Sequence, residues 1–171
     1  MRVYGVTGWK NSGKTTLVEA LVRDITGRGL RVSTVKHAHH AFDLDQPGKD
    51  SCRHRHAGAG QVLIASRARW ALMTELRDAE EPSLGDLLAR LDPVDLVLVE
   101  GYKRDRHPKI EARRAATAQN LIAEDDATIE AVASDAPLDR LAVPVFDLDD
   151  VRGIADYILR RVGLARGATR S

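Results

Sequence analysis

Cysteine, aromatic side chains, long apolar runs and net charge are all scarce in this sequence of 171 residues. The single cysteine, Cys52, excludes an intrachain disulfide framework and a zinc site built on several cysteines. No apolar run approaches the roughly 20 residues that a membrane-spanning helix needs. The formal net charge of +1 creates no long-range field that would attract nucleic acid. We therefore expect a protein with neither a membrane nor a nucleic-acid partner.

What is present is typical of one globular domain. The apolar share, 43%, is ordinary, and 171 residues suffice to bury a hydrophobic core. The first residues pass directly into a strand-like segment, which predicts that there is no secretion signal and that the protein is cytoplasmic. Because no linker or internal repeat is visible, we expect a single domain over residues 1–165. Residues 166–171 are predicted to form a disordered tail.

Residues 8–15 match the pattern G-x-x-x-x-G-K-[ST], the phosphate-binding P-loop. A strand-like run, residues 3–7, precedes the match. An amphipathic helix pattern follows it, from about Lys14 to Gly27 or Gly29. This order places loop amides and the positive end of the helix dipole around an anion. The flanking elements favour a phosphate site over the alternative, an ordinary glycine turn before a helix.

The loop residues have distinct expected roles. Lys14 reaches the β- and γ-phosphates, Thr15 offers its hydroxyl to Mg²⁺, and Thr16 binds the α-phosphate. The other loop residues expected to contact the nucleotide are Gly8, Lys10, Asn11, Ser12 and Gly13.

Residues 94–99 form the most continuous apolar run, which predicts a central strand buried on both faces and ending in Glu100. An acid at this place, beside the strand that leads into the P-loop, matches the carboxylate that holds Mg²⁺. A strand-end acid in solvent is the alternative. Asp95, at the other end of the strand, is expected to be a boundary residue. We assign the catalytic roles to Lys14 and Glu100.

Residues 36–51 are polar, and their first ten residues hold three histidines and two acids, which are His37, His39, His40, Asp43 and Asp45. They follow a predicted second strand, residues 30–35, at the sheet edge where open α/β folds bind ligands. Either acid could help to hold the metal, and we choose Asp45 together with Thr15 and Glu100. The histidines, His37 above all, could contact phosphate or an anionic substrate, although solvated loop residues are the alternative. Their short spacing and the lack of a cysteine partner disfavour zinc.

A basic segment follows this loop. Asp50 is expected to be the N-cap of a short helix that ends near Gly58. Lys49 and Arg53 are candidates to bind a phosphate of the nucleotide or of a second ligand, and a solvated helix face is the alternative. Arg53 and Arg55 are two residues apart and do not share a helical face, so at most one of them points into a site.

The remaining pattern completes an α/β fold. Residues 61–65 and 70–74 predict a small hairpin, and leucines after Ser83 predict a helix that runs through Leu91. Further strands are expected at 109–114, at an edge of the sheet, at 128–133 and at 143–146. A last helix begins at Asp149 or Asp150. Asp135, which follows the 128–133 segment, could accept hydrogen bonds from guanine or cap a helix.

These residues resemble the MobB family, the molybdopterin-guanine dinucleotide biosynthesis adaptor proteins. The resemblance covers about residues 1–150 and rests on residues 8–16, Val35-Lys36-His37, His39-His40, Phe42-Asp43, residues 48–51, Arg53-His54, Ala57-Gly58 and residues 99–103. It implies an α/β P-loop NTPase fold, with a mostly parallel sheet flanked by helices. It also implies that the protein binds GTP and Mg²⁺, forms a homodimer and is a weak GTPase at most.

The resemblance further implies a role in attaching GMP to molybdopterin, with molybdopterin or its guanylyltransferase as partner. It favours Asp43 or Asp45 near the metal. Some relatives carry a signature lysine directly after the first loop glycine; here Trp9 stands there, and Lys10 follows. The alternatives are a small-molecule kinase or ligase that holds its acceptor with the histidine-rich loop, and a zinc-binding module.

Overall fold

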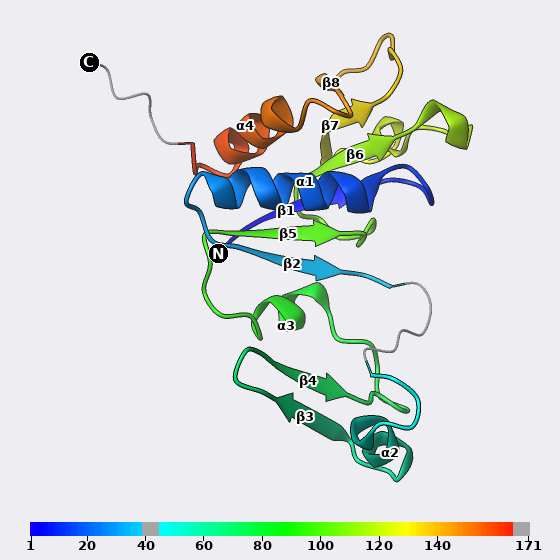
Figure 1. Cartoon of the computed structure of the whole chain (residues 1–171). Helices are drawn as coiled ribbons and strands as arrows, with labels where there is room; N and C mark the ends of the chain where they lie inside the picture. Colours follow the sequence, from blue (N-terminus) through cyan, green and yellow to red (C-terminus); the bar gives the residue numbers. More distant parts are fainter. Residues whose placement is uncertain (39–44, 166–171) are drawn as a thin grey trace. The chain divides into compact units, whose positions relative to one another are not determined.

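The computed structural model describes residues 1–38 and 45–165 (Figure 1). These residues belong to two compact units, a larger one of Met1–His37 and Leu84–Ser171 and a smaller one of Ala38–Ser83. The predictions made for His39, His40 and Asp43, and for the tail at 166–171, lie outside the described residues. That residues 1–165 act as one domain stays a prediction.

The larger unit is built on a six-stranded sheet in which all strand pairs are parallel, in the order β2-β5-β1-β6-β7-β8. The strands are β1 (Arg2–Thr7), β2 (Val32–Lys36), β5 (Leu96–Glu100), β6 (Lys109–Arg113), β7 (Ile129–Ser134) and β8 (Val145–Asp147). The predicted mostly parallel sheet is therefore confirmed. In Figure 1 the arrowheads of β2, β5 and β6 point toward the end where β1 turns into the first helix.

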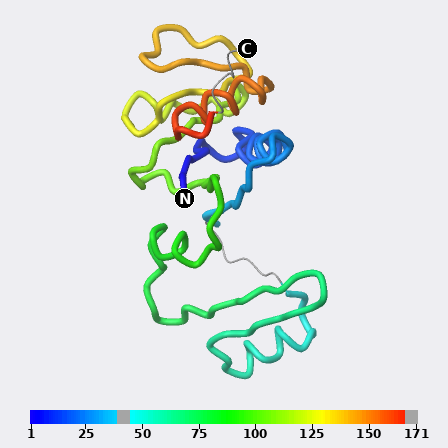
Figure 2. Tube along the Cα trace, turned by 90° about the vertical axis from the view of Figure 1, so that its left-hand side faces the viewer, coloured from blue at the N-terminus to red at the C-terminus, as the bar shows by residue number. Residues whose placement is uncertain are grey.

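Helices cover both faces of this sheet. α1 (Lys14–Gly27) and α4 (Val151–Arg161) share one core cluster with the sheet. On the other face, Leu84 of α3 (Leu84–Leu88) packs against Val97 and Val99 of β5. Figure 2, which looks roughly along the strands, shows α1 and α3 on opposite sides of β5. Every residue of β5 is buried, as a central strand requires.

The helices follow from simple patterns. Leu17, Leu21 and Ile25 recur every fourth residue along α1 and are buried in the core. α4 begins at an N-cap, Asp150, whose side chain accepts a hydrogen bond from the amide of Gly153 at 2.9 Å. Both boundaries agree with the sequence patterns. Among the described residues, no helix is long and apolar enough to cross a membrane.

Two expectations for the larger unit were wrong. Residues 109–114 were expected at an edge, yet β6 lies between β1 and β7 and is paired on both sides. It resembles an edge strand in sequence because two charged residues, Lys109 and Glu111, are buried in it. The helix after Ser83 also ends sooner than the leucine pattern indicated, at Leu88 rather than Leu91.

The smaller unit contains α2 (Asp50–His56) and the antiparallel hairpin of β3 (Gln61–Ala65) and β4 (Trp70–Thr74). The predicted hairpin is thus confirmed. Asp50 was expected to be the N-cap of α2, but it is the first helical residue, and Lys49 holds the cap position with no side-chain cap bond. Two short 3₁₀ turns of the larger unit, η1 (Ala115–Thr117) and η2 (Ile122–Glu124), follow β6.

Candidate nucleotide-binding site

The P-loop takes a backbone conformation that requires its glycines. Gly8 has a φ of 141° and Gly13 a φ of 92°, values that side chains rarely tolerate. A Cβ on Gly8 would lie 2.3 Å from the carbonyl oxygen of Ala112 in β6 and 2.5 Å from Oγ of Ser12. The loop therefore lies against β6 with no space for a methyl group, and α1 starts directly after it at Lys14.

The carbonyl of Trp9 accepts two hydrogen bonds from within the P-loop region. It accepts the amide of Ser12 at 3.2 Å and Nζ of Lys14 at 2.6 Å. Partial burial lowers the pKa of Lys14, and the nearby ammonium of Lys103 acts in the same direction. The Lys14 ammonium is thus held inside the loop, where an anion would relieve its unfavourable surroundings.

Glu100 lies beside this loop, as the sequence indicated. β5 pairs with β1, and β5 ends in Glu100, whose Oε1 accepts the hydroxyl of Thr15 at 2.8 Å. Its side chain is 10% exposed and forms an ion pair with Nζ of Lys36 at 3.2 Å. Three segments distant in the chain, the start of α1 and the ends of β2 and β5, therefore meet at one point.

This pair of oxygens suits a magnesium ion. Mg²⁺ binds oxygen ligands at about 2.1 Å in octahedral geometry, so neighbouring ligands lie about 2.9 Å apart. The observed 2.8 Å between Oγ1 of Thr15 and Oε1 of Glu100 matches that spacing. Thr15 and Glu100 could thus hold the ion directly or through water.

Two further cations, which the sequence patterns did not assign to the site, lie around the P-loop. Nζ of Lys103 lies 4.0 Å above the ring of Trp9, and Trp9 in turn donates to the carbonyl of Asn120 at 2.8 Å. The guanidinium of Arg114 would lie 3.2 Å from a Cβ on Gly13. Lys103 follows β5 and Arg114 follows β6, the two strands that flank β1. Their position just after these strands, at the carboxyl edge of the sheet, is the sequence feature that could have indicated them as site residues.

His37 lies at the same edge, directly after β2. Its amide donates to the carbonyl of Glu100 at 3.0 Å, and its ring lies 4.7 Å from the ring of Tyr102, measured between centroids. Lys10 and Asn11, at the outer side of the P-loop, are exposed, as is Thr16. Their nucleotide contacts stay predictions.

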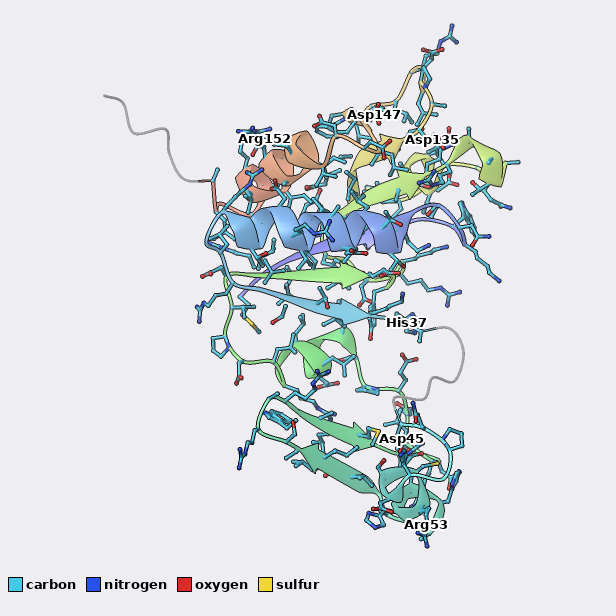
Figure 3. All side chains as sticks on the ribbon, viewed as in Figure 1. His37, Asp45, Arg53, Asp135, Asp147 and Arg152 are labelled. Atoms are coloured by element: carbon cyan, nitrogen blue, oxygen red, sulfur yellow. The ribbon has the colours of Figure 1, made fainter. Side chains whose placement is uncertain are left out.

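Asp135 lies at the carboxyl ends of β7 and β8. The next element of the chain after Asp135 is β8 rather than a helix, so the N-cap alternative was wrong. Oδ1 of Asp135 instead accepts the amide of Ala115, the first residue of η1, at 2.8 Å. A cavity of about 240 Å³ opens here between residues 134–137 and 145–147. Figure 3 shows Asp135 and Asp147 close together at this edge.

In the smaller unit, Asp45 forms a two-point ion pair with Arg55. The guanidinium reaches Oδ1 at 2.6 Å and Oδ2 at 3.3 Å, and it also binds Glu75 at 2.8 Å. This pairing lowers the pKa of Asp45. Both carboxylate oxygens of the predicted metal ligand are thus engaged, and its role at a metal stays a prediction.

The two arginines of α2 have different surroundings. The Arg55 side chain is 14% exposed and paired with Asp45 and Glu75, whereas Arg53 is 76% exposed and lies 3.9 Å from Asp50. Figure 3 labels Arg53 together with Asp45 in this unit. Of the two, Arg53 is the one open to a ligand, and Lys49 beside it is also exposed. Within residues 1–38 and 45–165, no group of three His, Cys, Asp or Glu residues could hold a metal ion.

Comparison with known proteins identifies the family. The profile of the family described as MobB, molybdopterin guanine dinucleotide synthesis protein B, matches residues 3–135. The chain belongs to the MobB family. It is 44% identical to the molybdopterin-guanine dinucleotide biosynthesis adapter protein of Escherichia coli (strain K12), with 88% of this chain and 87% of that protein covered. It is 42% identical to the protein of the same description from Haemophilus influenzae, over 91% and 86% of the two chains.

A solved structure agrees with the MobB assignment. The crystal structure of a MobB protein homolog from Bacillus stearothermophilus is 35% identical, with a TM-score of 0.67 over 95% of this chain and 99% of that one. The region that matches the MobB profile contains the P-loop, Lys36, Glu100 and Asp135, whereas β8 and α4 lie beyond it.

Proposed function

We propose that this chain is a GTP- and Mg²⁺-binding adaptor protein of molybdenum cofactor biosynthesis. It assists the attachment of GMP to molybdopterin, which forms molybdopterin guanine dinucleotide, and it is a weak GTP hydrolase at most. The proposal rests on one observation, the P-loop lysine next to the Thr15–Glu100 pair, together with membership of the MobB family. A cytoplasmic location fits the cofactor synthesis described for the relatives.

We expect the P-loop residues to contact the triphosphate of the bound GTP. Lys14 exchanges the Trp9 carbonyl for the β- and γ-phosphates, and the loop amides and Thr16 bind the other phosphate oxygens. The hydroxyl of Ser12 is buried without a hydrogen-bond partner among the described residues, and a phosphate oxygen would supply one. Thr15 and Glu100 would hold Mg²⁺, which would neutralise part of the phosphate charge.

Isothermal titration calorimetry with GTP, in Mg²⁺ and in EDTA, tests this proposal. We expect Lys14→Ala to weaken GTP binding by about tenfold or more, the effect of losing one charge-assisted hydrogen bond, and to leave the fold intact. Unchanged affinity would refute the P-loop assignment. Steady phosphoryl transfer from GTP to a small acceptor would instead favour a kinase or ligase.

Guanine selectivity is proposed to come from Asp135. A carboxylate accepts the N1–H and N2–H₂ groups of guanine, which adenine does not offer, and the cavity between β7 and β8 lies beside it. Asp135→Asn keeps the oxygen that accepts the Ala115 amide but replaces the other by a donor. This variant should lose affinity for GTP and gain affinity for xanthosine triphosphate, whose O2 accepts a hydrogen bond. An unchanged preference would exclude Asp135 from base recognition.

A homodimer is proposed to form through the hairpin of the smaller unit. Leu63 and Leu72 pair directly across the strands, and Trp70 lies on the same face opposite Ala65. Leu63, Leu72 and Trp70 are 61%, 48% and 67% exposed, which is unusual for a cluster of large apolar side chains. Trp70→Glu should give a monomer by light scattering. Arg69→Ala, with the same change in charge at the neighbouring turn, should stay dimeric, and a dimeric Trp70→Glu would exclude this face.

Arg53 and Lys49 are proposed to bind a second anionic ligand, molybdopterin or a segment of its guanylyltransferase. Arg53 is 76% exposed, and its ion-pair partner among the residues that the structure describes, Asp50, lies 3.9 Å away. Arg53→Ala should therefore spare GTP affinity and weaken binding of the guanylyltransferase. A loss of GTP affinity alone would contradict this assignment.

A further inference from the structure

Lys36 occupies an unusual position among the cations of the site. It is the last residue of β2 and pairs in register with Glu100 of β5. Its Nζ lies 3.2 Å from Oε1 of Glu100 and 3.3 Å from Oγ1 of Thr15, while these two oxygens are 2.8 Å apart. The three atoms form a triangle. The lysine ammonium therefore sits over the same pair of oxygens that suits a magnesium ion.

The surroundings explain why a cation is needed there. The Glu100 side chain is 10% exposed, and a carboxylate removed from water is costly unless it is paired. Among the residues that the structure describes, Lys36 is the one ion-pair partner of Glu100. The Lys36 side chain itself is 56% exposed, so its ammonium can leave the carboxylate for water or for another anion at little cost.

The neighbouring charges add a second constraint. Nζ of Lys14 lies 2.6 Å from the carbonyl of Trp9, Nζ of Lys103 lies 4.0 Å above the Trp9 ring, and Nζ of Lys36 lies beside Thr15. Three ammonium groups therefore gather at the P-loop before any phosphate is present. A divalent cation arriving alone would meet this positive charge and would also have to displace Lys36. A cation that arrives with a triphosphate meets neither obstacle, because the phosphates attract the ammonium groups.

We infer that Lys36 is a positioning residue that competes with the divalent cation for Thr15 and Glu100, and so couples metal binding to triphosphate binding. This inference rests on the proposed function, because it takes the Thr15–Glu100 pair to be the metal site. Without nucleotide, Lys36 neutralises Glu100 and holds free metal ions off. With nucleotide, its ammonium is released from Glu100 and remains beside the phosphates on its flexible stem.

The first test measures Mn²⁺ affinity in the absence of nucleotide by electron paramagnetic resonance. Lys36→Met should bind Mn²⁺ about three- to tenfold more tightly than the unsubstituted protein, since a partly buried ion pair no longer has to be broken. Lys36→Arg keeps the charge and should bind as weakly as the unsubstituted protein. Arg31→Gln removes one positive charge at the other end of β2, from a side chain 69% exposed beside Asp95, and should change nothing. Equal or weaker Mn²⁺ binding by Lys36→Met would overturn the inference.

The second test measures GTP affinity with and without metal. In EDTA, Lys36→Met should weaken GTP binding by about threefold or more, because the released ammonium is missing from the phosphates. In Mg²⁺ the loss should be smaller, so the metal dependence of GTP binding increases. An equal loss in both conditions would mean that Lys36 only binds phosphate, and would overturn the inference. If the unsubstituted protein bound no GTP, the proposed function would fail, while the Mn²⁺ measurement would still decide on Lys36. Lys36→Gln serves as a second variant if Lys36→Met does not fold.

Discussion

A single methyl group at Gly8 is expected to disrupt both the fold and the site. In Gly8→Ala the new carbon would lie 2.3 Å from the Ala112 carbonyl and 2.5 Å from Oγ of Ser12, with the backbone at a φ of 141°. The Ser12 side chain could rotate, but the Ala112 carbonyl belongs to β6 and is held by the sheet. Either the P-loop separates from β6 or its backbone changes conformation.

The expected cost of Gly8→Ala is the sum of two contributions. A residue other than glycine in this backbone region costs about 1–3 kcal/mol, and overpacking a buried site costs about 1–3 kcal/mol more. Because the two relieve each other in part, we expect about 2–5 kcal/mol. For a chain of this size that lowers Tm by about 4–20 °C.

Differential scanning calorimetry and GTP titration together test this prediction. Gly27→Ala is the matched control, because it makes the same change at the end of α1, where a Cβ would meet nothing within 4 Å. We expect Gly27→Ala to raise stability by up to about 0.5–1 kcal/mol, through better helix propensity. Gly8→Ala should also bind GTP more weakly. A Tm within about 1 °C of the unsubstituted protein would refute the account of the loop against β6.

Three further predictions concern charge. Glu100→Gln keeps an oxygen that accepts the hydroxyl of Thr15 but loses the negative charge. The factor by which Mg²⁺ increases GTP affinity should therefore fall by about tenfold or more. If the ratio of the Kd values in EDTA and in Mg²⁺ did not change, Glu100 would not be a metal ligand. Burial lowers the pKa of His107 from 6.5 to about 4, so below pH 6.5 the unfolded chain takes up the proton first. The free energy of unfolding should therefore fall by up to about 3 kcal/mol between pH 6.5 and 4, and denaturant titrations should show a flatter profile for His107→Leu. Asp45→Asn removes the charge of one of the two described carboxylates that bind Arg55, and hydrogen exchange should show faster opening of α2. Unaltered exchange would mean that the Asp45–Arg55 ion pair does not hold the smaller unit together.

Much of the architecture could be predicted from the sequence because its signals are local. The strand, glycine loop and helix around Lys14 follow from short patterns, and the apolar run that ends in Glu100 predicts its burial. Their adjacency follows from a general rule, since parallel strands bring their carboxyl ends to one edge of a sheet. The position of β6 did not follow, because Lys109 and Glu111 are charged yet buried.

Partners across the chain were harder to predict. Lys109 donates to the carbonyl of Asp105 and, at 2.6 Å, to Oγ1 of Thr128. Glu111 accepts the amides of Ile122 and Ala123 at 3.1 and 2.9 Å, so later segments supply most of the partners of these two side chains. The periodicity of apolar residues in the sequence does not predict hydrogen bonds between distant segments. The same holds for Lys36, which the sequence showed only as part of the Val35-Lys36-His37 motif, with no partner indicated.

The most direct test of the central claim is a structure of the protein with a non-hydrolysable GTP analogue and Mg²⁺. We predict the triphosphate within the P-loop, Nζ of Lys14 on the β- and γ-phosphates, and the ion beside Thr15 and Glu100. A triphosphate bound elsewhere, with Lys14 still on the carbonyl of Trp9, would contradict the account.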